Sequence, residues 1–561
     1  MPLSALNTRW VPFLDVRGHI FNNSKPAANA GIRLRYIESR VWGGNIYYDY
    51  RKTHERNYNQ VSFGVESLGR YLDYRLNGYF PVGKHKGSLS DATFDHFAGN
   101  SLYLSRKQEL AIKGTNAEVG VHIAKVKGID FYSALGPYYF ANDTKHTFGG
   151  EFRIGMDVLN ILRIEGNTSY DHLFKWIGQG QISLSYAFTP KKMSRKEKKG
   201  SCSFHGLVRD RAFQRVDKQE IIVVSTQKKK SVAINPATGL PYTFWFVDNT
   251  SHSQGTYESP FNTLAAAEGA SGPNDIIAIL PGNGTDRGMN QGIQLKNGQK
   301  LWGMSVLHAL PTTLGTIRIK PLASMMPTLS NSNGVVINSP NDGISNNDIV
   351  GLRIVENQGF IGIDIDVNGN YNIENNIFLC SKNGYGISFF NIVGNANIVH
   401  NTFIGTDNTK TEGIDIFNCS GNFTISNNLF TGMPGTGLAC GIEVDYTNAP
   451  LNCSIVGNTI NFTNIYQGIG IYKNTPATNA AFLIADNKIN NLYLSPRQDL
   501  TTSGIYIQVQ GDISTTLRNN QSTTPDPVNS PAYLFNNSSG ASKSQINFAP
   551  DNVGNAQYTG F

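Results

Sequence analysis

The chain has 561 residues, of which 40% are hydrophobic and 16% charged, and its formal net charge is +7. This length exceeds one ordinary domain and this composition excludes a disordered chain, so two or more folded domains are expected. No run of about 18 apolar residues occurs, which argues against a transmembrane helix and leaves a β-barrel as the way to cross a bilayer.

The first residues, MPLSALNTRWVPF, lack the basic segment followed by an apolar segment that marks a secretory signal. We therefore expect that an exported form of this sequence is mature, truncated or begun at the wrong start codon.

Residues 9–188 consist of short runs in which apolar and polar side chains alternate, which is the period of β-strands. In one run, Ile46 and Tyr48 share a face, and Asp49 lies on the other. Nearly every run carries Arg, Asp, Glu or His on the second face, and a sandwich core could not bury so many charges. A sandwich with its charged faces in water is the alternative, but a transmembrane barrel with a polar lumen fits the pattern better.

The runs are about ten residues long, which suits strands that cross a bilayer at a tilt. Roughly eleven occur between Arg9 and Phe188, and because bacterial barrels have an even number of strands we expect about twelve. The stretch Ala92–Gly114 is predicted to contain two of them. The predicted fold is all-β: an N-terminal transmembrane antiparallel barrel over residues 9–188, and a C-terminal right-handed parallel β-helix.

Six spaced motifs occur in order within about residues 9–225: GNIYYDYR (Gly44–Arg51), YNQVSFGVE (Tyr58–Glu66), LNGYFPVG (Leu76–Gly83), NAEVGVHI (Asn116–Ile123), GPYYF (Gly136–Phe140) and QISLSYAF (Gln181–Phe188). Together they resemble the β-domain of inverse autotransporters, the intimin/invasin family. The resemblance implies a twelve-stranded outer-membrane barrel whose chain returns through the pore and displays a C-terminal passenger. It also implies contact with outer-membrane lipid and with the barrel assembly machinery, whose recognition signal the terminal Phe188 resembles.

Residues 189–232 carry many charges and little apolar periodicity, and we assign them to a linker that threads the pore. Arg209–Ile222 (RDRAFQRVDKQEII) resembles the linker that follows the barrel in the family. About thirty extended residues reach on the order of 100 Å, far more than the hydrocarbon core. We expect Arg209, Arg211, Arg215 and Lys218 to pair with the lumenal acids Asp49, Glu66, Glu118 and Glu151. An ordinary flexible interdomain linker is the alternative.

The basic run Lys191–Lys199 (KKMSRKEKK) is the one feature that could suggest nucleic acid. It has no interleaved aromatic residues and no accompanying motif, so a solvated linker is the better interpretation and no nucleic-acid partner is predicted.

The five cysteines form no CxxC pair and have no accompanying cluster of His and Cys ligands, so no metal site is predicted: Cys202, Cys380, Cys419, Cys440 and Cys453. Buried thiols are expected, and a disulfide is the alternative if the chain is exported.

Residues 233–561 are rich in Asn, Gly, Ile and Thr and form the predicted passenger. Gly255–Leu264, Asp275–Gly282 and Leu295–Gly303 resemble the N-terminal entry of pectate-lyase-like, right-handed β-helices. A repeat follows in which each unit starts with Gly-Ile-x-hydrophobic and closes with Asn-x-hydrophobic. The unit starts are spaced by 24, 27, 28, 27 and 36 residues: Gly362, Gly386, Gly413, Gly441, Gly468 and Gly504.

A repeat of this length predicts the three-stranded coils of a parallel β-helix. The first and third residues after each start should point inward and stack on their equivalents about 4.8 Å away. We expect the Asn of each closing segment to adopt a left-handed turn, with the side-chain amides stacked in a ladder.

Acidic residues at outward positions are the candidates for chemistry. Asp415 and Glu443 lie on adjacent coils, so their carboxyl groups are expected about 5 Å apart, a separation compatible with retaining glycoside hydrolysis. Asp364 with Asp366, or Glu443 with Asp445, could instead hold Ca²⁺. Surface carboxylates are common on solenoids and no catalytic Arg or Lys is evident, so the sequence favours no enzymatic activity, no cofactor and no metal.

Four aromatic residues on the same face are candidates for ligand binding: Phe390, Phe417, Tyr472 and Tyr506. They could stack on sugar rings or contact a protein, and scattered surface aromatics are the alternative interpretation.

Three functions remain open. The first is a cell-surface display protein of the outer membrane, whose extracellular passenger binds a host protein or glycan as an adhesin. The second is a surface-tethered polysaccharide lyase or hydrolase, and the third is a structural spacer.

Overall fold

The computed structural model describes residues 9–20, 24–53, 56–88, 90–126, 129–142, 146–158, 162–184, 211–212, 214–251, 254–341, 343–356, 360–381, 383–406, 412–432, 440–446, 450–461, 467–473, 480–490, 503–509, 513–524, 531–537 and 545–561. Several predicted features lie outside these residues: Phe188, the run Lys191–Lys199, Cys202 and Arg209. Within the described part, no helix is long and apolar enough to cross a membrane.

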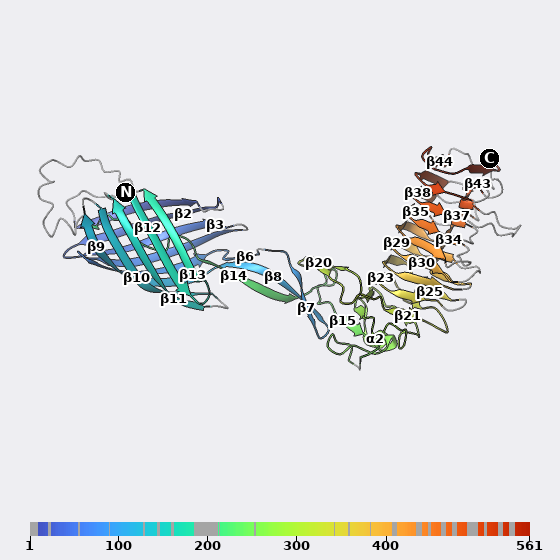
Figure 1. Cartoon of the computed structure of the whole chain (residues 1–561), viewed down its shortest axis with the longest axis horizontal. Coiled ribbons are helices and arrows are strands. Elements are labelled where there is room, and N and C mark those ends of the chain that lie inside the picture. The colour runs from blue at the N-terminus through green and yellow to red at the C-terminus, as the bar shows by residue number, and fades with distance from the viewer. Residues whose placement is uncertain are drawn as a thin grey trace. The chain divides into compact units, whose positions relative to one another are not determined.

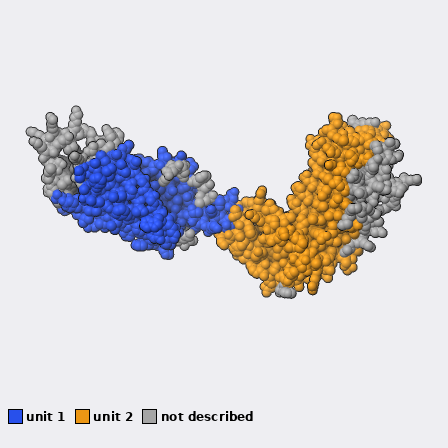
Figure 2. Space-filling model, in the orientation of Figure 1, with its two compact units in different colours: residues 1–92, 105–229 blue, residues 93–104, 230–561 orange. Residues whose placement is uncertain are grey.

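The chain divides into two compact units, which are coloured separately in Figure 2. The first unit comprises residues 1–92 and 105–229, and the second comprises residues 93–104 and 230–561.

The first unit contains a curved antiparallel sheet of ten strands (Figure 1). Its strands, in spatial order, are β1 (Trp10–Ile20), β2 (Pro26–Ile37), β3 (Val41–Lys52), β4 (Asn57–Leu68), β5 (Leu72–Val82), β9 (Lys113–Val126), β10 (Ile129–Ala141), β11 (His146–Val158), β12 (Leu162–Asp171) and β13 (Lys175–Leu184). Strands β1 and β13 end this order, and among the described pairings no ladder joins them.

The alternation of side chains places apolar residues on one face of this sheet and charged residues on the other, as predicted. On β3, Ile46 and Tyr48 are 48% and 52% exposed, whereas Tyr47 and Asp49 between and beside them are 1% exposed. An apolar outer face with a buried polar inner face is the pattern of a transmembrane barrel.

The prediction of about twelve strands in this sheet is wrong for the described residues. The two strands in Ala92–Gly114 exist, as β7 (Thr93–Ala98) and β8 (Ser101–Ala111), but they lie outside the large sheet. They form a separate four-stranded sheet with β6 (Lys86–Ser88) and β14 (Val224–Val232). Strand β5 pairs directly with β9, and Leu102 and Leu104 of β8 are buried, unlike the exposed apolar residues of a lipid-facing strand.

The second unit is a parallel β-solenoid, as the repeat predicted, whose coils contribute strands to three sheets (Figure 1). The first sheet contains β15 (Phe244–Val247), β16 (Ile276–Ile279), β18 (Lys300–Gly303), β23 (Ser345–Val350), β26 (Gly369–Glu374), β29 (Val393–Val399), β32 (Ser420–Ser426), β35 (Leu451–Val456), β38 (Ala480–Ala485), β41 (Ile513–Arg518) and β44 (Ile546–Phe548).

The second sheet contains β17 (Ile293–Gln294), β22 (Ile337–Asn338), β25 (Ile361–Ile365), β28 (Tyr385–Phe390), β31 (Glu412–Phe417), β34 (Cys440–Tyr446), β37 (Gln467–Lys473), β40 (Ser503–Val509), β43 (Tyr533–Asn537) and β45 (Ala556–Thr559). The third contains β21 (Thr328–Ser330), β24 (Arg353–Val355), β27 (Ile377–Cys380), β30 (Thr402–Gly405), β33 (Leu429–Gly432), β36 (Thr459–Asn461), β39 (Lys488–Asn490) and β42 (Gln521–Ser522). The unit also contains a short helix, α2 (Leu264–Ala270), the hairpin of β19 (His308–Thr312) and β20 (Gly315–Ile319), and residues 93–104 with β7 and the start of β8.

The solenoid core consists of stacked side chains from equivalent positions, as predicted. All twelve residues expected to point inward on the second sheet are buried: Ile363, Ile365, Ile387, Phe389, Ile414, Ile416, Ile442, Val444, Ile469, Ile471, Ile505 and Ile507. On the third sheet, Phe378, Phe403 and Phe430 form a continuous stack with ring centroids 4.6 and 4.7 Å apart.

The predicted amide ladder is present and buried, but the left-handed turn lies one residue earlier than expected. The ladder consists of Asn376, Asn401, Asn428, Asn458, Asn487 and Asn520, each bonded to the equivalent residue of the next coil. The preceding residue adopts positive φ, as at Asn375 (55°) and Gly457 (68°), because this conformation turns the next amide into the core.

Candidate functional site

A short segment, residues 211–222, lies against the polar inner face of the ten-stranded sheet. We call it the bore segment, and its described residues are 211–212 and 214–222. Its backbone carbonyl groups accept hydrogen bonds from arginines on the sheet, including Arg35 to Ala212 at 3.1 Å and Arg17 to Val216 at 2.7 Å. Charged side chains of the sheet thus take the place of water as hydrogen-bond donors to the segment's carbonyl groups. Hydrogen bonds with a charged donor are stronger than those between neutral groups.

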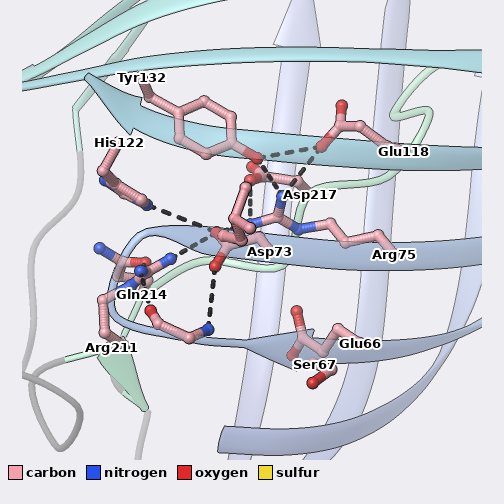
Figure 3. Close-up of polar contacts among 12 residues, drawn as sticks. Glu66, Ser67, Asp73, Arg75, Glu118, His122, Tyr132, Arg211, Gln214 and Asp217 are labelled. Atoms are coloured by element: carbon pink, nitrogen blue, oxygen red, sulfur yellow. Dashed lines mark hydrogen bonds and ion pairs between the residues drawn. The ribbon is translucent and has the colours of Figure 1, made fainter. Parts of the chain in front are cut away.

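The first charged residue of the bore segment, Arg211, pairs with the buried carboxylate of Asp73 (Figure 3). His122 approaches the same carboxylate at 3.4 Å, and Arg75 approaches it at 3.1 Å. Arg211 also donates to the carbonyl oxygen of Gly69, at the turn that precedes β5. Since Asp73 lies at the start of β5, this contact fixes one end of the segment near the turn that joins β4 to β5.

Asp217 lies at the centre of a cluster of charges in the bore. Its carboxylate is within 3.0–3.5 Å of four guanidinium groups, which belong to Arg75, Arg153, Arg163 and Arg215. The first three arginines lie on β5, β11 and β12. The carboxylate of Asp217 thus offsets the positive charge of arginines from three different strands, which would otherwise repel one another.

The linker cations pair with bore acids, although mostly not with the acids expected. Lys218 donates to Asp49 at 2.6 Å, as predicted, and to Ser62 at 3.1 Å. Arg211 pairs instead with Asp73, and Arg215 lies near Glu165 at 3.6 Å.

The other three expected acids have partners on the sheet itself. Glu66 accepts from Arg35 at 2.6 Å, Glu118 accepts from Arg153 at 2.6 Å, and Glu151 accepts from the Asn116 amide at 2.8 Å. Each pair joins strands that are two apart in the sheet, across β3 or across β10, and the sequence alone could not supply this adjacency.

Glu220 connects the two end strands of the sheet. One carboxylate oxygen accepts from Arg17 on β1, and the other accepts from Gln181 on β13 at 2.9 Å. His19 on β1 lies 3.6 Å from the same group. Both edges of the sheet therefore reach a single side chain of the bore segment.

A cavity of about 420 Å³ remains beside the segment. It is lined mainly by polar side chains of both sheet and segment, including Asn167, Gln179 and Glu220. The space is large enough for several water molecules, so the bore is filled only in part.

Asp217 and Glu220 are two residues of the bore segment that the sequence alone did not indicate. The sequence signal that could have indicated them is the presence of two acidic residues in a stretch whose other charged residues are basic. A solvated linker would not require acidic residues at these positions.

In the solenoid, the candidate acids lie on the outward face of the second sheet, with Asp364 two coils before Asp415 and Ser388 between them. Asp415 and Glu443 are direct register partners on β31 and β34, as predicted. Glu412, which the sequence analysis did not single out, forms a hydrogen bond with Glu443. Burial and the neighbouring Glu443 raise the pKa of Glu412 to about 9 and that of Asp415 to about 7. Burial and Asp445 also raise the pKa of Glu443.

The four candidate aromatic residues form two pairs and not a continuous stripe. Phe390 and Phe417 stack with ring centroids 5.2 Å apart, and Phe390 is 48% exposed. Tyr472 and Tyr506 form a second pair at 5.1 Å, but Tyr506 is only 7% exposed. Asp445 occupies the position between the pairs, since it is the register partner of both Phe417 and Tyr472.

The four described cysteines are free and buried: Cys380, Cys419, Cys440 and Cys453. In the described part of the chain, no three His, Cys, Asp or Glu residues are grouped closely enough to hold a metal ion.

Comparison with known proteins finds a match to one family model. Residues 10–99 match the family model described as "Inverse autotransporter, beta-domain". No curated protein matches the sequence. One solved structure, from a study titled "Unveiling the Mechanism Behind the in-meso Crystallization of Membrane Proteins", is 12% identical with a TM-score of 0.30, covering 40% of this chain and 90% of that chain.

Proposed function

We propose that this chain is an outer-membrane inverse autotransporter that anchors, exports and displays its own C-terminal solenoid at the cell surface. The observation that carries this proposal is the bore segment, whose Arg211, Lys218 and Glu220 pair with Asp73, Asp49 and Arg17 on the inner face of the sheet. A flexible interdomain linker has no need of such pairs. The match of residues 10–99 to the inverse autotransporter β-domain supports the same function.

The proposal predicts which part of the chain is accessible from outside the cell. Protease added to intact Gram-negative cells that produce the chain should remove residues beyond about 233 and leave the N-terminal sheet protected. Lysed cells serve as the control, because there the protease reaches both faces of the membrane. A solenoid that is degraded only after lysis would contradict display.

For the displayed solenoid we propose ligand binding, as in an adhesin, with the stacked pair Phe390 and Phe417 as the contact. The half-exposed ring of Phe390 offers a flat apolar surface of the kind that stacks on sugars or protein side chains. Cells displaying Phe390→Ala should lose binding in a glycan or receptor screen. Ile344→Ala, which removes an exposed apolar residue elsewhere on the solenoid, is the control. Equal binding by both variants would remove this pair from the proposal.

A surface-tethered glycoside hydrolase is the second candidate, and the raised pKa values near Asp415 favour it. A carboxyl group with a pKa of about 7 beside a second carboxyl group is an arrangement suited to general acid catalysis. Turnover of a polysaccharide by displayed wild-type solenoid, abolished in Asp415→Ala and Glu443→Ala, would establish hydrolysis over simple binding. Binding without turnover supports the adhesin, and neither binding nor turnover supports a spacer.

A further inference from the structure

Residues 93–104, which we call the cap hairpin, belong to the compact unit of the solenoid (Figure 2). In sequence, however, they lie between β5 and β9, two strands of the N-terminal sheet. The cap hairpin consists of β7, a turn at Gly99 and Asn100, and the start of β8. Gly99 has a φ of 55°, which suits this tight turn.

One aromatic side chain of the cap hairpin is inserted among aromatics of the first solenoid coil. Phe97 is 4% exposed and meets the rings of Phe244 and Phe246 on β15, each at a centroid distance of 5.0 Å. The ring of Tyr257 lies 5.5 Å from that of Phe97. The edge-on geometry of the first two contacts is the favourable one for aromatic pairs.

The turn of the cap hairpin also bonds to the backbone of that coil. The Asn100 amide donates to the carbonyl oxygens of Phe244 at 2.7 Å and Gly255 at 3.0 Å. In return, the backbone N–H of Phe244 donates to the Asn100 carbonyl at 2.9 Å, and that of Tyr257 donates to Gly99 at 3.0 Å. The Gly99 N–H donates to the Glu258 carboxylate.

These contacts occur where the solenoid needs a cover. Strand β15 is the end strand of the eleven-stranded sheet. No preceding coil therefore covers its backbone edge or the apolar side chains of the core next to it. An uncovered solenoid end exposes both unpaired strand edge and core, and terminal caps are a general requirement of such folds.

We propose that the cap hairpin is a docking surface for the first solenoid coil, residues 233–261, and is the template on which that coil folds after export. The inference rests on the proposed export of the solenoid.

The order of the chain favours this role. Strand β14, which directly follows the bore segment, pairs with β8, and Ala233 then donates to the carbonyl oxygen of Leu102 at 2.9 Å. Ser101 forms a bridge with Thr243, immediately before β15. A solenoid folds by nucleating one coil and adding neighbours, so a preformed partner for the first coil accelerates the slow step.

The test is a pulse-chase experiment on cells that produce the full chain, with external protease added at intervals. Phe97→Ala should delay the appearance of protease-resistant solenoid about tenfold, because destabilising a folding nucleus slows folding. Tyr103→Ala is the matched control, since its ring stacks on His96 within the same hairpin, and it should fold at the wild-type rate. Asn100→Ala, which removes the amide bonds to the coil, should act as Phe97→Ala does.

Insertion of the N-terminal sheet is followed in the same samples by its heat-dependent gel mobility. If Phe97→Ala impairs insertion, Tyr257→Ala, which alters the solenoid side of the contact, takes its place and should give the same delay. Wild-type folding rates in these variants would overturn the proposal. So would a lower urea midpoint of the solenoid without any delay, since the hairpin would then stabilise the coil without templating it.

A second measurement separates this inference from export. Purified full-length chain is unfolded in urea and refolded in detergent, where no translocation occurs. A delay of the solenoid in Phe97→Ala during this refolding supports the template even if the protease experiment shows no display. Display of the wild-type solenoid together with identical refolding rates leaves the proposed function intact and rejects the template.

Discussion

Asp217 compensates four guanidinium groups at once, and its removal leaves them close together in a partly dry bore. We expect Asp217→Asn to destabilise docking of the bore segment by about 3 kcal/mol or more, as for other buried pairs that lose one partner. Trypsin should then cleave at Arg211 or Arg215 in detergent-solubilised protein that is otherwise folded. Glu38→Gln, at an exposed position on the turn after β2, is the control and should leave both sites protected.

The acids of the solenoid face give a second prediction at the scale of single residues. Because the pKa values of Glu412 and Asp415 are raised to about 9 and about 7, the folded state holds protons that the unfolded state releases near pH 4. The stability that this provides is complete below the unfolded pKa values and is lost as pH rises through the folded ones.

The free energy of unfolding of the solenoid, measured by urea denaturation, should therefore fall between pH 5 and pH 9, by about 1.4 kcal/mol per pH unit for each group that is still protonated in the folded state. Glu412→Gln should flatten this dependence. Glu374→Gln changes a carboxylate of the same domain that is 38% exposed and should not flatten it. A midpoint that rises with pH in the wild type would contradict the raised pKa values.

At the scale of secondary-structure elements, the buried amide ladder links each coil to the next. Asn428 donates to Asn458 at 3.0 Å and to the Ile398 carbonyl at 2.8 Å, and its oxygen accepts from Asn401. Asn428→Ala leaves these partners unsatisfied and should lower the solenoid's free energy of unfolding by about 2–4 kcal/mol. The measurement is the urea midpoint at a fixed pH.

Asn422→Ala provides a matched control for this change. Asn422 belongs to a second ladder on the solenoid surface, where it donates to Asn395 at 2.8 Å in an exposed position. Water can replace its partners, so the cost should stay below about 1 kcal/mol. Equal losses in the two variants would show that burial does not decide the contribution of a ladder.

The strands themselves could be predicted well from the sequence, because period-two alternation reports directly which side chains face lipid, bore or core. The inward Ile residues and the ladder amides follow in the same way from the coil repeat. The position of β7 and β8 outside the large sheet could not be predicted, because Leu102 and Leu104 alternate with polar residues as in a lipid-facing strand. Only the pairing of β5 with β9 distinguishes the two cases, and that pairing is a contact between distant residues.

The partners of the bore segment were predictable in kind but not in detail. Its basic residues indicated pairing with bore acids, and Lys218 with Asp49 was correct. The partners of Arg211 and Arg215 depend on strand tilt and register, and these cannot be predicted from the number and sign of the charges. The broken aromatic stripe has the same origin, because one Asp in the column of Phe417 and Tyr472 separates the two pairs.

At the scale of the whole molecule, we expect the bore segment to determine how permeable the N-terminal unit is. Replacing residues 211–222 with a Gly/Ser sequence of equal length removes the side chains that pair with the inner face. We expect a several-fold increase in ion conductance across planar lipid bilayers, because bores without a fixed plug conduct. Protein with the single change Glu38→Gln should conduct as the wild type does, and equal conductance of the Gly/Ser variant would show that the segment does not plug the bore.

The contact of Glu220 with both end strands has a mechanical consequence. Under the proposed function, a ligand that pulls on the solenoid would transmit its tension through residue 222 into the bore, where the pull meets the contacts of Glu220 with Arg17 and Gln181 before it reaches the cluster at Asp217. Because those contacts lie on opposite edges of one sheet, the tension draws the edges toward a common point. If the solenoid binds a ligand as proposed, attachment under flow would thus draw the two end strands of the sheet more tightly onto Glu220.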